Sequence, residues 1–407
     1  MEGIPQEVVT APVHAVTSGR PHFFGYYDKC PWSPDGSHLL AGEADFQDRP
    51  PTPADRLRLG TIDLATGAFE VFAETTAWSW QQGAMLQWVP GSPSSVVANA
   101  RRDDGSLGAV VRDLAGGRTR WLDRPIYALS PNGHDAVSLD FHRIQTCRPG
   151  YGYPPGEVLE PPRWAPDDDG VWHLDVTTGR SRLVVSLAEL AAFEPDPRVE
   201  RAPSYVNHAG FDPTGSRLCF FHLWSDPAWV YEHTGRWFTV APDGADLFLL
   251  SRHDIQSHFD WRDEHTLLGW AMEPLDRPLA GPYGHWYEHQ ETAGAYWLYR
   301  DRTHDRELFA EAVLPHDGHM SFSPDRRWIV TDEYSVLPGN DGTRPLLLFE
   351  IATGRRLEVA RFAEPLEGEL RCDLHPRWSR DGRQVCVDSS HEGTRQVYIV
   401  DVSGIVG

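Results

Sequence analysis

The chain has 407 residues and a formal net charge of −22, and it is rich in turn formers, with 36 glycines and 33 prolines. This excess of acidic groups argues against nucleic acid or an anionic membrane surface as a partner, and no apolar run approaches the roughly 18–20 residues that cross a bilayer. The five cysteines are scattered and odd in number, which argues against a disulfide framework. Because the amino terminus has neither a basic start nor an apolar core, we expect a cytoplasmic protein.

A short turn motif recurs along the chain. An aromatic or apolar anchor is followed by Ser or Asp, Pro, Asp or Asn, and Gly, or by a degraded copy, and then by an apolar run. The seven anchors are Trp32, Trp88, Leu129, Phe211, Trp261, Phe322 and Trp378. Repeats of roughly 40–60 residues built from short strands and Asp-Gly turns are typical of propeller blades. We therefore predict an all-β fold, a single seven-bladed β-propeller over residues 1–407.

The two ends of the chain predict how the propeller closes. Residues 397–401 form an apolar strand with no partner after it, and residues 7–16 form a spare strand before the first anchor. Pairing of the amino-terminal strand with the last blade would remove an exposed sheet edge. A β-sandwich or a two-domain chain is the alternative, which the seven copies of the motif disfavour.

Histidines recur at one position of the repeat. The residues three before the anchors are Lys29, Met85, Ile126, His208, His258, His319 and His375. Histidine therefore fills this position in the last four blades, and Cys372 lies three residues before His375. The position enters the innermost strand of a blade, which lines the central channel. We expect the four imidazoles to converge near one mouth of that channel.

Imidazole and thiolate together suit one divalent metal ion. We expect His258, His319 and His375 to bind it, with Cys372 as a fourth ligand; sulfur ligation favours zinc, and manganese or iron are the alternatives. His208, furthest round the ring, is then a candidate catalytic base or substrate contact. The competing interpretation is that these histidines only donate hydrogen bonds to backbone carbonyls between blades.

Three long insertions interrupt the repeat, at residues 140–169, 225–235 and 273–292. Loops of this length in a compact fold are commonly functional, and aromatic faces within them could stack on sugar rings. Candidate substrate contacts in two of them are Arg143, Arg148, Tyr151 and Trp286. The arginines would pair with a substrate carboxylate. The alternative is that these loops only cover blade edges.

Several motifs resemble those of a known group of enzymes. They are Tyr205-Val-Asn-His208, Ser257-His258-Phe-x-Trp261, Gly318-His319-x-Ser-Phe-Ser-Pro, Cys372-x-x-His375-Pro-x-Trp, Phe23-Phe-Gly-Tyr-Tyr-Asp28 and Trp80-Gln-Gln-Gly83. The set resembles the seven-bladed polysaccharide lyases, which include cytoplasmic oligogalacturonate lyases and the ulvan and rhamnose–glucuronate lyases. The last two motifs add Tyr27 and Gln82 as candidate substrate contacts.

The resemblance implies a chemistry. In these families a uronate loses its C5 proton to a His or Tyr, an Arg neutralises the carboxylate, and channel histidines hold a metal. His208 matches the base, and His222 matches a second histidine of the ulvan-type enzymes. The families also carry a Tyr and an Arg before the residue matching His258, where this chain has Phe238 and Asp254. Nearby substitutes are Tyr231, Arg236 and Arg252.

We therefore expect a metal-containing lyase that acts by β-elimination on a small acidic carbohydrate, a uronate-bearing oligosaccharide. The same groups would also serve a metal-dependent isomerase, epimerase or cyclase of a small metabolite, because each reaction begins with a similar proton abstraction. The third alternative is a non-catalytic binding or scaffold propeller, because fold alone does not decide function. The choice among these reactions and the oligomeric state stay open at this point.

Overall fold

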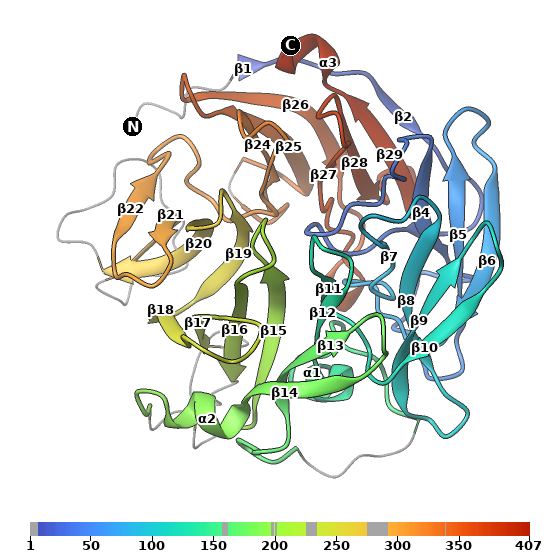
Figure 1. Cartoon of the computed structure of the whole chain (residues 1–407). Helices are drawn as coiled ribbons and strands as arrows, with labels where there is room; N and C mark the ends of the chain where they lie inside the picture. The colour runs from blue at the N-terminus through green and yellow to red at the C-terminus, as the bar shows by residue number, and fades with distance from the viewer. Residues whose placement is uncertain are drawn as a thin grey trace. The chain divides into compact units, whose positions relative to one another are not determined.

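The computed structural model describes residues 7–156, 162–196, 199, 202–224, 234–274, 292–337 and 339–407, without the side chains of residues 254, 292 and 293. Within these residues the strands form seven sheets (Figure 1). Six sheets have four strands, and the seventh carries a fifth strand at its edge. This arrangement is the predicted seven-bladed β-propeller.

Each sheet is a meander of neighbouring strands. The first contains β3 (His22–Phe23), β4 (His38–Glu43), β5 (Leu57–Asp63) and β6 (Phe69–Thr75). The second contains β7 (Gln87–Trp88), β8 (Ser95–Arg101), β9 (Leu107–Asp113) and β10 (Thr119–Leu122). The third contains β11 (Ala128–Leu129), β12 (Asp135–Ser138), β13 (Gly170–Asp175) and β14 (Ser181–Ser186). The fourth contains β15 (Ser204–Phe211), β16 (Leu218–Trp224), β17 (Thr234–Val240) and β18 (Phe248–Asp254).

The later sheets follow the same plan. The fifth contains β19 (Gln256–Trp261), β20 (Thr266–Pro274), β21 (Thr292–Arg300) and β22 (Arg306–Phe309). The sixth contains β23 (Ser321–Phe322), β24 (Trp328–Asp332), β25 (Thr343–Glu350), β26 (Arg355–Ala363) and the edge strand β1 (Glu7–Val8). The seventh contains β27 (Arg377–Trp378), β28 (Gln384–Ser389), β29 (Gln396–Asp401) and β2 (Val13–Ala15).

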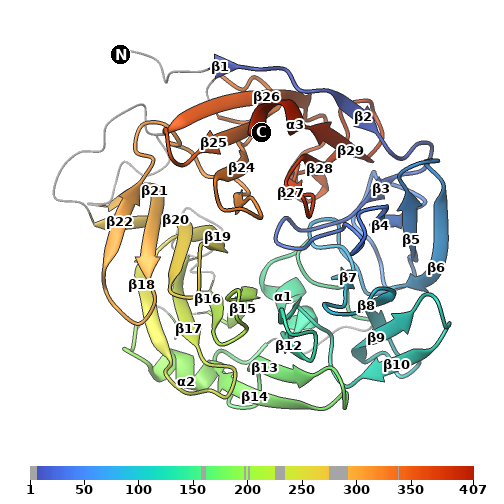
Figure 2. The same cartoon turned by 45° about the horizontal axis from the view of Figure 1, so that its top comes forward.

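The amino-terminal segment closes the last blade, as predicted. Strand β2 runs antiparallel beside β29, with Val13 opposite Val400 and Ala15 opposite Tyr398 (Figure 2). The expected single strand is in fact two: β1 pairs in parallel with β26 of the preceding sheet, with Glu7 opposite Leu357. Both pairings cover sheet edges that would otherwise expose unpaired backbone groups.

The recurring turn motif has a physical basis in side-chain hydrogen bonds. At the first, sixth and seventh anchors the Ser hydroxyl donates to the Asp carboxylate over 2.6 Å. The same hydroxyl accepts a backbone N–H of the following strand, as Ser33 does from His38 over 3.0 Å. Gly36 closes its turn at φ 75°, a left-handed conformation in which glycine carries no Cβ penalty. The sixth turn has Arg326 there instead, at φ 60°.

The chain forms two compact units. The first comprises Met1–Gln47, Thr61–Glu70 and Gln256–Gly407, and the second comprises Asp48–Gly60 and Val71–Ile255. In the first unit, apolar side chains of the sixth and seventh sheets form a continuous core that includes Trp328, Leu348, Val387 and Tyr398. Their burial from water is the main favourable contribution to folding of this region. The single domain expected over residues 1–407 stays a prediction.

Three short α-helices and a 3-10 helix are described outside the sheets. They are α1 (Phe141–Cys147), α2 (Leu187–Ala192), α3 (Ser403–Val406) and the 3-10 helix η3 (Gly368–Leu370). Asp140 caps α1 by accepting the backbone N–H groups of His142 and Arg143, so the first predicted insertion begins with a helix. Among the described residues, no helix has the length and apolarity needed to cross a membrane.

Candidate functional site

The backbone departs from regular strand geometry where it carries the recurring histidines. In β15, residues 208 and 209 oppose one residue of β16, and in β19, residues 257 and 258 oppose one residue of β20. Such bulges redirect a side chain out of the regular strand alternation. His208 and His375 also adopt positive φ, at 54° and 44°. Strained backbone of this kind is concentrated at functional sites, so the repeat position is a structurally distinct one.

Three of the predicted histidines come together in the first unit. The ring centroids of His258 and His319 are 4.2 Å apart, and those of His319 and His375 are 4.4 Å apart. All three are buried, with exposed fractions of 6% or less. His208 belongs to the second unit.

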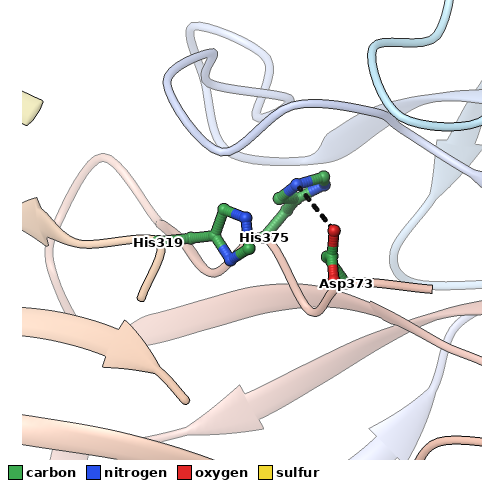
Figure 3. A group of neighbouring side chains, drawn as sticks. All are labelled: His319, Asp373 and His375. Carbon is green, nitrogen blue, oxygen red and sulfur yellow. Dashed lines mark ion pairs between the residues drawn. The ribbon is translucent and has the colours of Figure 1, made fainter. Parts of the chain in front are cut away.

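A carboxylate that the motifs did not single out completes a possible metal site. One ligand atom from each of His319, Asp373 and His375 lies within 4.8 Å of the other two (Figure 3). Nε2 of His375 is 4.0 Å from a carboxylate oxygen of Asp373 and has no hydrogen-bond partner among the described residues. The signal was present in the sequence, because Asp373 and His375 are two residues apart beside the recurring motif.

Cys372 and His258 lie outside this group of three. The Cys372 thiol is buried, which raises its pKa to about 12, and its backbone N–H donates to Glu364 over 3.0 Å. A thiol with a raised pKa is a poor ligand until a metal displaces its proton. The ligand role of Cys372 therefore stays a prediction, and Asp373 is the acidic group beside the imidazoles.

Carboxylates orient two of the imidazoles. Asp332 accepts the backbone N–H of His319 and the ring Nδ1–H, each over 2.8 Å. Asp317 lies 3.1 Å from Nδ1 of His258 and also accepts the Ser257 hydroxyl over 2.6 Å. Because an ionised carboxylate only accepts, Nδ1 carries the proton and Nε2 keeps its lone pair. This is the arrangement in which metal-binding histidines are held.

The electrostatics suit a cation. Burial and the neighbouring His319 lower the pKa of His375 well below its ordinary value, so its imidazole is neutral at neutral pH. Burial alone would raise the pKa of Asp373, but Arg344 and Arg371 outweigh it and hold that pKa well below the usual range. The Asp373 carboxylate is therefore ionised. Neutral imidazole and ionised carboxylate are the forms that bind metals.

The charged groups around the three imidazoles and Asp373 do not balance one another. The carboxylates are Asp317, Asp332 and Asp373 itself, and the guanidinium groups are Arg344 and Arg371. Three acids against two bases leave a net negative charge among these groups when all the acids are ionised and the histidines are neutral. A buried uncompensated charge is costly, and one divalent cation would neutralise it. The residues present therefore fit a divalent metal.

The tyrosines of the Phe23–Asp28 motif lie against the same histidines. The Tyr26 ring centroid is 4.9 Å from that of His375. The Tyr27 hydroxyl donates to the carbonyl of Phe259 over 2.8 Å and accepts its N–H over 2.9 Å. Because Phe259 follows His258, Tyr27 fixes the backbone beside that histidine. Its predicted role as a substrate contact remains untested.

In the second unit, His208 faces a guanidinium group. Arg148 NH1 is 3.3 Å from Nε2 of His208, and the Arg148 guanidinium lies 3.8 Å from the Tyr151 ring centroid. Since arginine only donates hydrogen bonds, Nε2 of His208 accepts and the imidazole is neutral. The structure thus brings together three predicted residues, an imidazole and a guanidinium group beside an aromatic ring, and their roles stay predictions.

Gln82, another predicted substrate contact, joins this cluster through Asn207. Its amide nitrogen donates to the Tyr127 hydroxyl over 2.8 Å and approaches the Asn207 side-chain oxygen at 3.4 Å. Asn207 Nδ2 is in turn 3.4 Å from Nε2 of His208. The carbonyl oxygen of Gln82 is buried, with no hydrogen-bond partner among the described residues.

The other predicted cations are engaged in structural contacts. Arg236 donates to the carbonyls of Leu190 (2.7 Å), Phe193 (2.7 Å) and Glu194 (3.0 Å) at the end of α2. It also lies 3.2 Å from Nδ1 of His222, whose pKa burial and Arg236 hold well below its ordinary value. These contacts give Arg236 and His222 a structural role, and their catalytic role stays a prediction.

Arg143 and Arg252 are placed in a similar way. Arg143 donates to the carbonyls of Ser204 (2.6 Å) and Trp164 (3.2 Å), which joins α1 to β15. Arg252 forms a half-exposed ion pair with Glu194. Among the predicted arginines, Arg148 is therefore the one that the structure places beside His208. Tyr231 and Trp286 lie outside the described residues, as does the side chain of Asp254, and Phe238 stacks on Phe220.

Comparison with solved structures identifies the fold. An oligogalacturonate lyase in complex with manganese is similar, with a TM-score of 0.65 and 15% identity over 98% of this chain and 95% of that one. So is the oligogalacturonate lyase of Vibrio parahaemolyticus, with a TM-score of 0.65 and 14% identity over 97% and 98%.

A third similar structure is the β-propeller domain of the trilobed protease from Pyrococcus furiosus, with a TM-score of 0.52 and 10% identity over 93% of this chain and 96% of that one. Comparison with protein-family models gives no match, and neither does comparison with curated proteins. At these identities the likeness shows the fold alone: the chain is a seven-bladed β-propeller like those of the oligogalacturonate lyases.

Proposed function

We propose that the protein is a metal-associated lyase that cleaves a uronate-bearing oligosaccharide by β-elimination. The observation that carries this proposal is the pair formed by the neutral imidazole of His208 and the guanidinium of Arg148, with Nε2 and NH1 3.3 Å apart. A base and a fixed cation are what removal of a proton next to a carboxylate requires. The likeness to oligogalacturonate lyases supports the substrate class.

The proposed roles follow from the chemistry of the step. Removing the C5 proton of a uronate builds negative charge on its carboxylate, and a cation aimed at that group stabilises the transition state. Arg148 would bind the carboxylate in two-point fashion. The substrate would thereby draw the guanidinium away from Nε2 of His208 and free the lone pair that takes the proton. Tyr151 and the carbonyl of Gln82 would contact the sugar.

We further propose that His319, Asp373 and His375 hold one divalent ion, with His258 beside them. The preference for zinc depended on Cys372 as a sulfur ligand. A set of two imidazoles and a carboxylate suits manganese or iron as well, and one of the similar lyases contains manganese. When bound, the ion would supply positive charge that neutralises an acidic group of the substrate. We keep the cytoplasm as the expected location.

The test measures elimination and metal content in the same variants. Purified protein is incubated with uronate oligosaccharides, the ultraviolet absorbance of the unsaturated product is followed, and bound metal is measured by plasma mass spectrometry. His208→Asn should abolish product formation and keep the metal, whereas His319→Gln should lose the metal. His265→Asn, at a half-exposed histidine, is the control. Full activity of His208→Asn would disprove the assigned base.

The same experiment separates the alternatives. An isomerase or epimerase would exchange the C5 hydrogen with deuterium from the solvent without cleaving the chain, because the same base removes the same proton. A cyclase of a small metabolite would leave the oligosaccharides intact and unexchanged while its activity still required His208. A metal-free wild-type protein that neither cleaves nor exchanges would favour the scaffold interpretation.

A further inference from the structure

One buried arginine contacts three carboxylates around the candidate metal centre. Arg344, in β25, is 2% exposed. Its NH2 is 2.5 Å from Oδ1 of Asp373, its Nε donates to Glu364 over 2.7 Å, and its NH1 is 3.9 Å from Oδ2 of Asp332. No sequence motif marks this residue, because it lies in β25, a middle strand of its sheet, away from the repeat position.

Each of these carboxylates is a candidate metal ligand or contacts the chain at or beside one. Asp373 is itself one of the three. Asp332 holds the backbone N–H and Nδ1–H of His319. Glu364 accepts the backbone N–H of Cys372, which fixes the main chain immediately before Asp373. One guanidinium group therefore contacts one candidate ligand directly and approaches the carboxylate that holds a second.

The contacts also distinguish the two oxygens of Asp373. Arg344 takes Oδ1, at 2.5 Å, whereas Oδ2 is the oxygen 4.0 Å from Nε2 of His375. Arg371 contacts both oxygens of Asp373, with Nε 3.0 Å from Oδ2 and 3.3 Å from Oδ1. The rigid fork of an arginine matches such a task better than a lysine does. Arg344 therefore holds Oδ1, whereas Oδ2, which Arg371 also contacts, faces Nε2 of His375 and keeps a second lone pair for a metal.

We propose that Arg344 is a positioning residue of the metal centre, which makes Asp373 a ligand through Oδ2 alone and holds Asp332 against His319. This inference rests on the proposed metal centre. The competing explanation is a buried ion network that stabilises the fold and has no influence on the metal. The two explanations differ in whether a substitution of Arg344 lowers the metal affinity more than it lowers the free energy of unfolding.

The test compares metal affinity with the stability of the metal-free protein. Arg344→Lys keeps the charge and loses the fork, and we expect its Mn²⁺ affinity, measured by competition with a chromogenic chelator, to fall about 10- to 100-fold. The matched control is Arg356→Lys, because Arg356 is also buried and pairs with Glu333 over 2.9 Å in the neighbouring strand β26. The control should keep wild-type affinity.

The outcomes are distinct. If Arg344→Lys binds Mn²⁺ as tightly as the wild type does, the proposal for Arg344 is overturned and the metal centre stands. If the wild type binds no Mn²⁺, the metal centre fails and this proposal fails with it. Should Arg344→Lys not fold, Glu364→Gln replaces it, because it weakens the hold on Nε of Arg344 and keeps the side-chain shape. Unchanged affinity in Glu364→Gln would overturn the proposal equally.

Discussion

Gly318 offers a sharp test of the geometry around His319. A Cβ added at residue 318 would lie 1.8 Å from the backbone oxygen of Asp332 and 2.6 Å from Oγ1 of Thr331. Ordinary contact between such atoms begins near 3.4 Å, so Gly318→Ala requires a displacement of about 1.5 Å. The obstacle is main chain of β24, which cannot rotate away as a side chain can. The loop that carries His319 must therefore move away from Asp332.

The cost follows from what this movement breaks. Forcing an extra carbon into a packed site costs about 1–3 kcal/mol, and losing the hydrogen bond from the His319 N–H to a carboxylate costs about 1.5–3 kcal/mol more. We expect the free energy of unfolding of Gly318→Ala to fall by about 3–5 kcal/mol. Because Nδ1 of His319 loses its partner as well, Mn²⁺ affinity should fall about 10- to 100-fold.

Urea unfolding of the metal-free protein and chelator competition measure the two effects. Gly404→Ala is the control, because a Cβ there has no atom within 4 Å and Gly404 lies in the same unit. That variant should match the wild type in both assays. If Gly318→Ala behaved like Gly404→Ala, the close approach of Gly318 to β24 would be wrong, and so would the orientation of His319 by Asp332.

Three further predictions concern buried groups. Burial and Asp140 raise the pKa of Asp169 to about 6, above its unfolded value, so the contribution of this carboxyl to stability is lost as pH rises from about 4 through 6. In urea unfolding at pH 8, Asp169→Asn should therefore be more stable than the wild type by on the order of 1–3 kcal/mol. An unchanged dependence of stability on pH in this variant would refute the prediction. Arg236→Met leaves buried carbonyls at the end of α2 without donors and should lower the unfolding free energy by about 2–4 kcal/mol; loss of activity at full stability would instead restore its catalytic role. Tyr27→Phe removes both hydrogen bonds to Phe259 and loosens the backbone beside His258; if His258 is a further ligand, as the sequence predicts, Mn²⁺ affinity should drop severalfold, and unchanged chelator competition would contradict that ligand role.

The local pattern of the sequence was enough for the fold. The Ser-Pro-Asp-Gly turns are encoded by neighbouring residues, as the bond from Ser33 to Asp35 shows, so their recurrence counted the blades. The repeat also predicted that equivalent positions come together, and three of the four histidines, His258, His319 and His375, do. Closure by β2 followed from the unpaired last strand. Each inference needed only periodicity, because a repeat places equivalent residues in equivalent environments.

The choice among candidates needed the tertiary structure. Four arginines were equivalent in the sequence, yet Arg148 meets His208 while Arg236 ends on the carbonyls of α2. No motif marked Arg344, and the motifs did not single out Asp373, although the two lie 2.5 Å apart and beside the histidines. The partners in such an ion pair are far apart along the chain and do not recur with the repeat. Whether an ionisable group serves chemistry or packing depends on what surrounds it after folding. Repetition in the sequence therefore determined the scaffold and the histidine position, and three-dimensional packing decided which acids and cations complete the site.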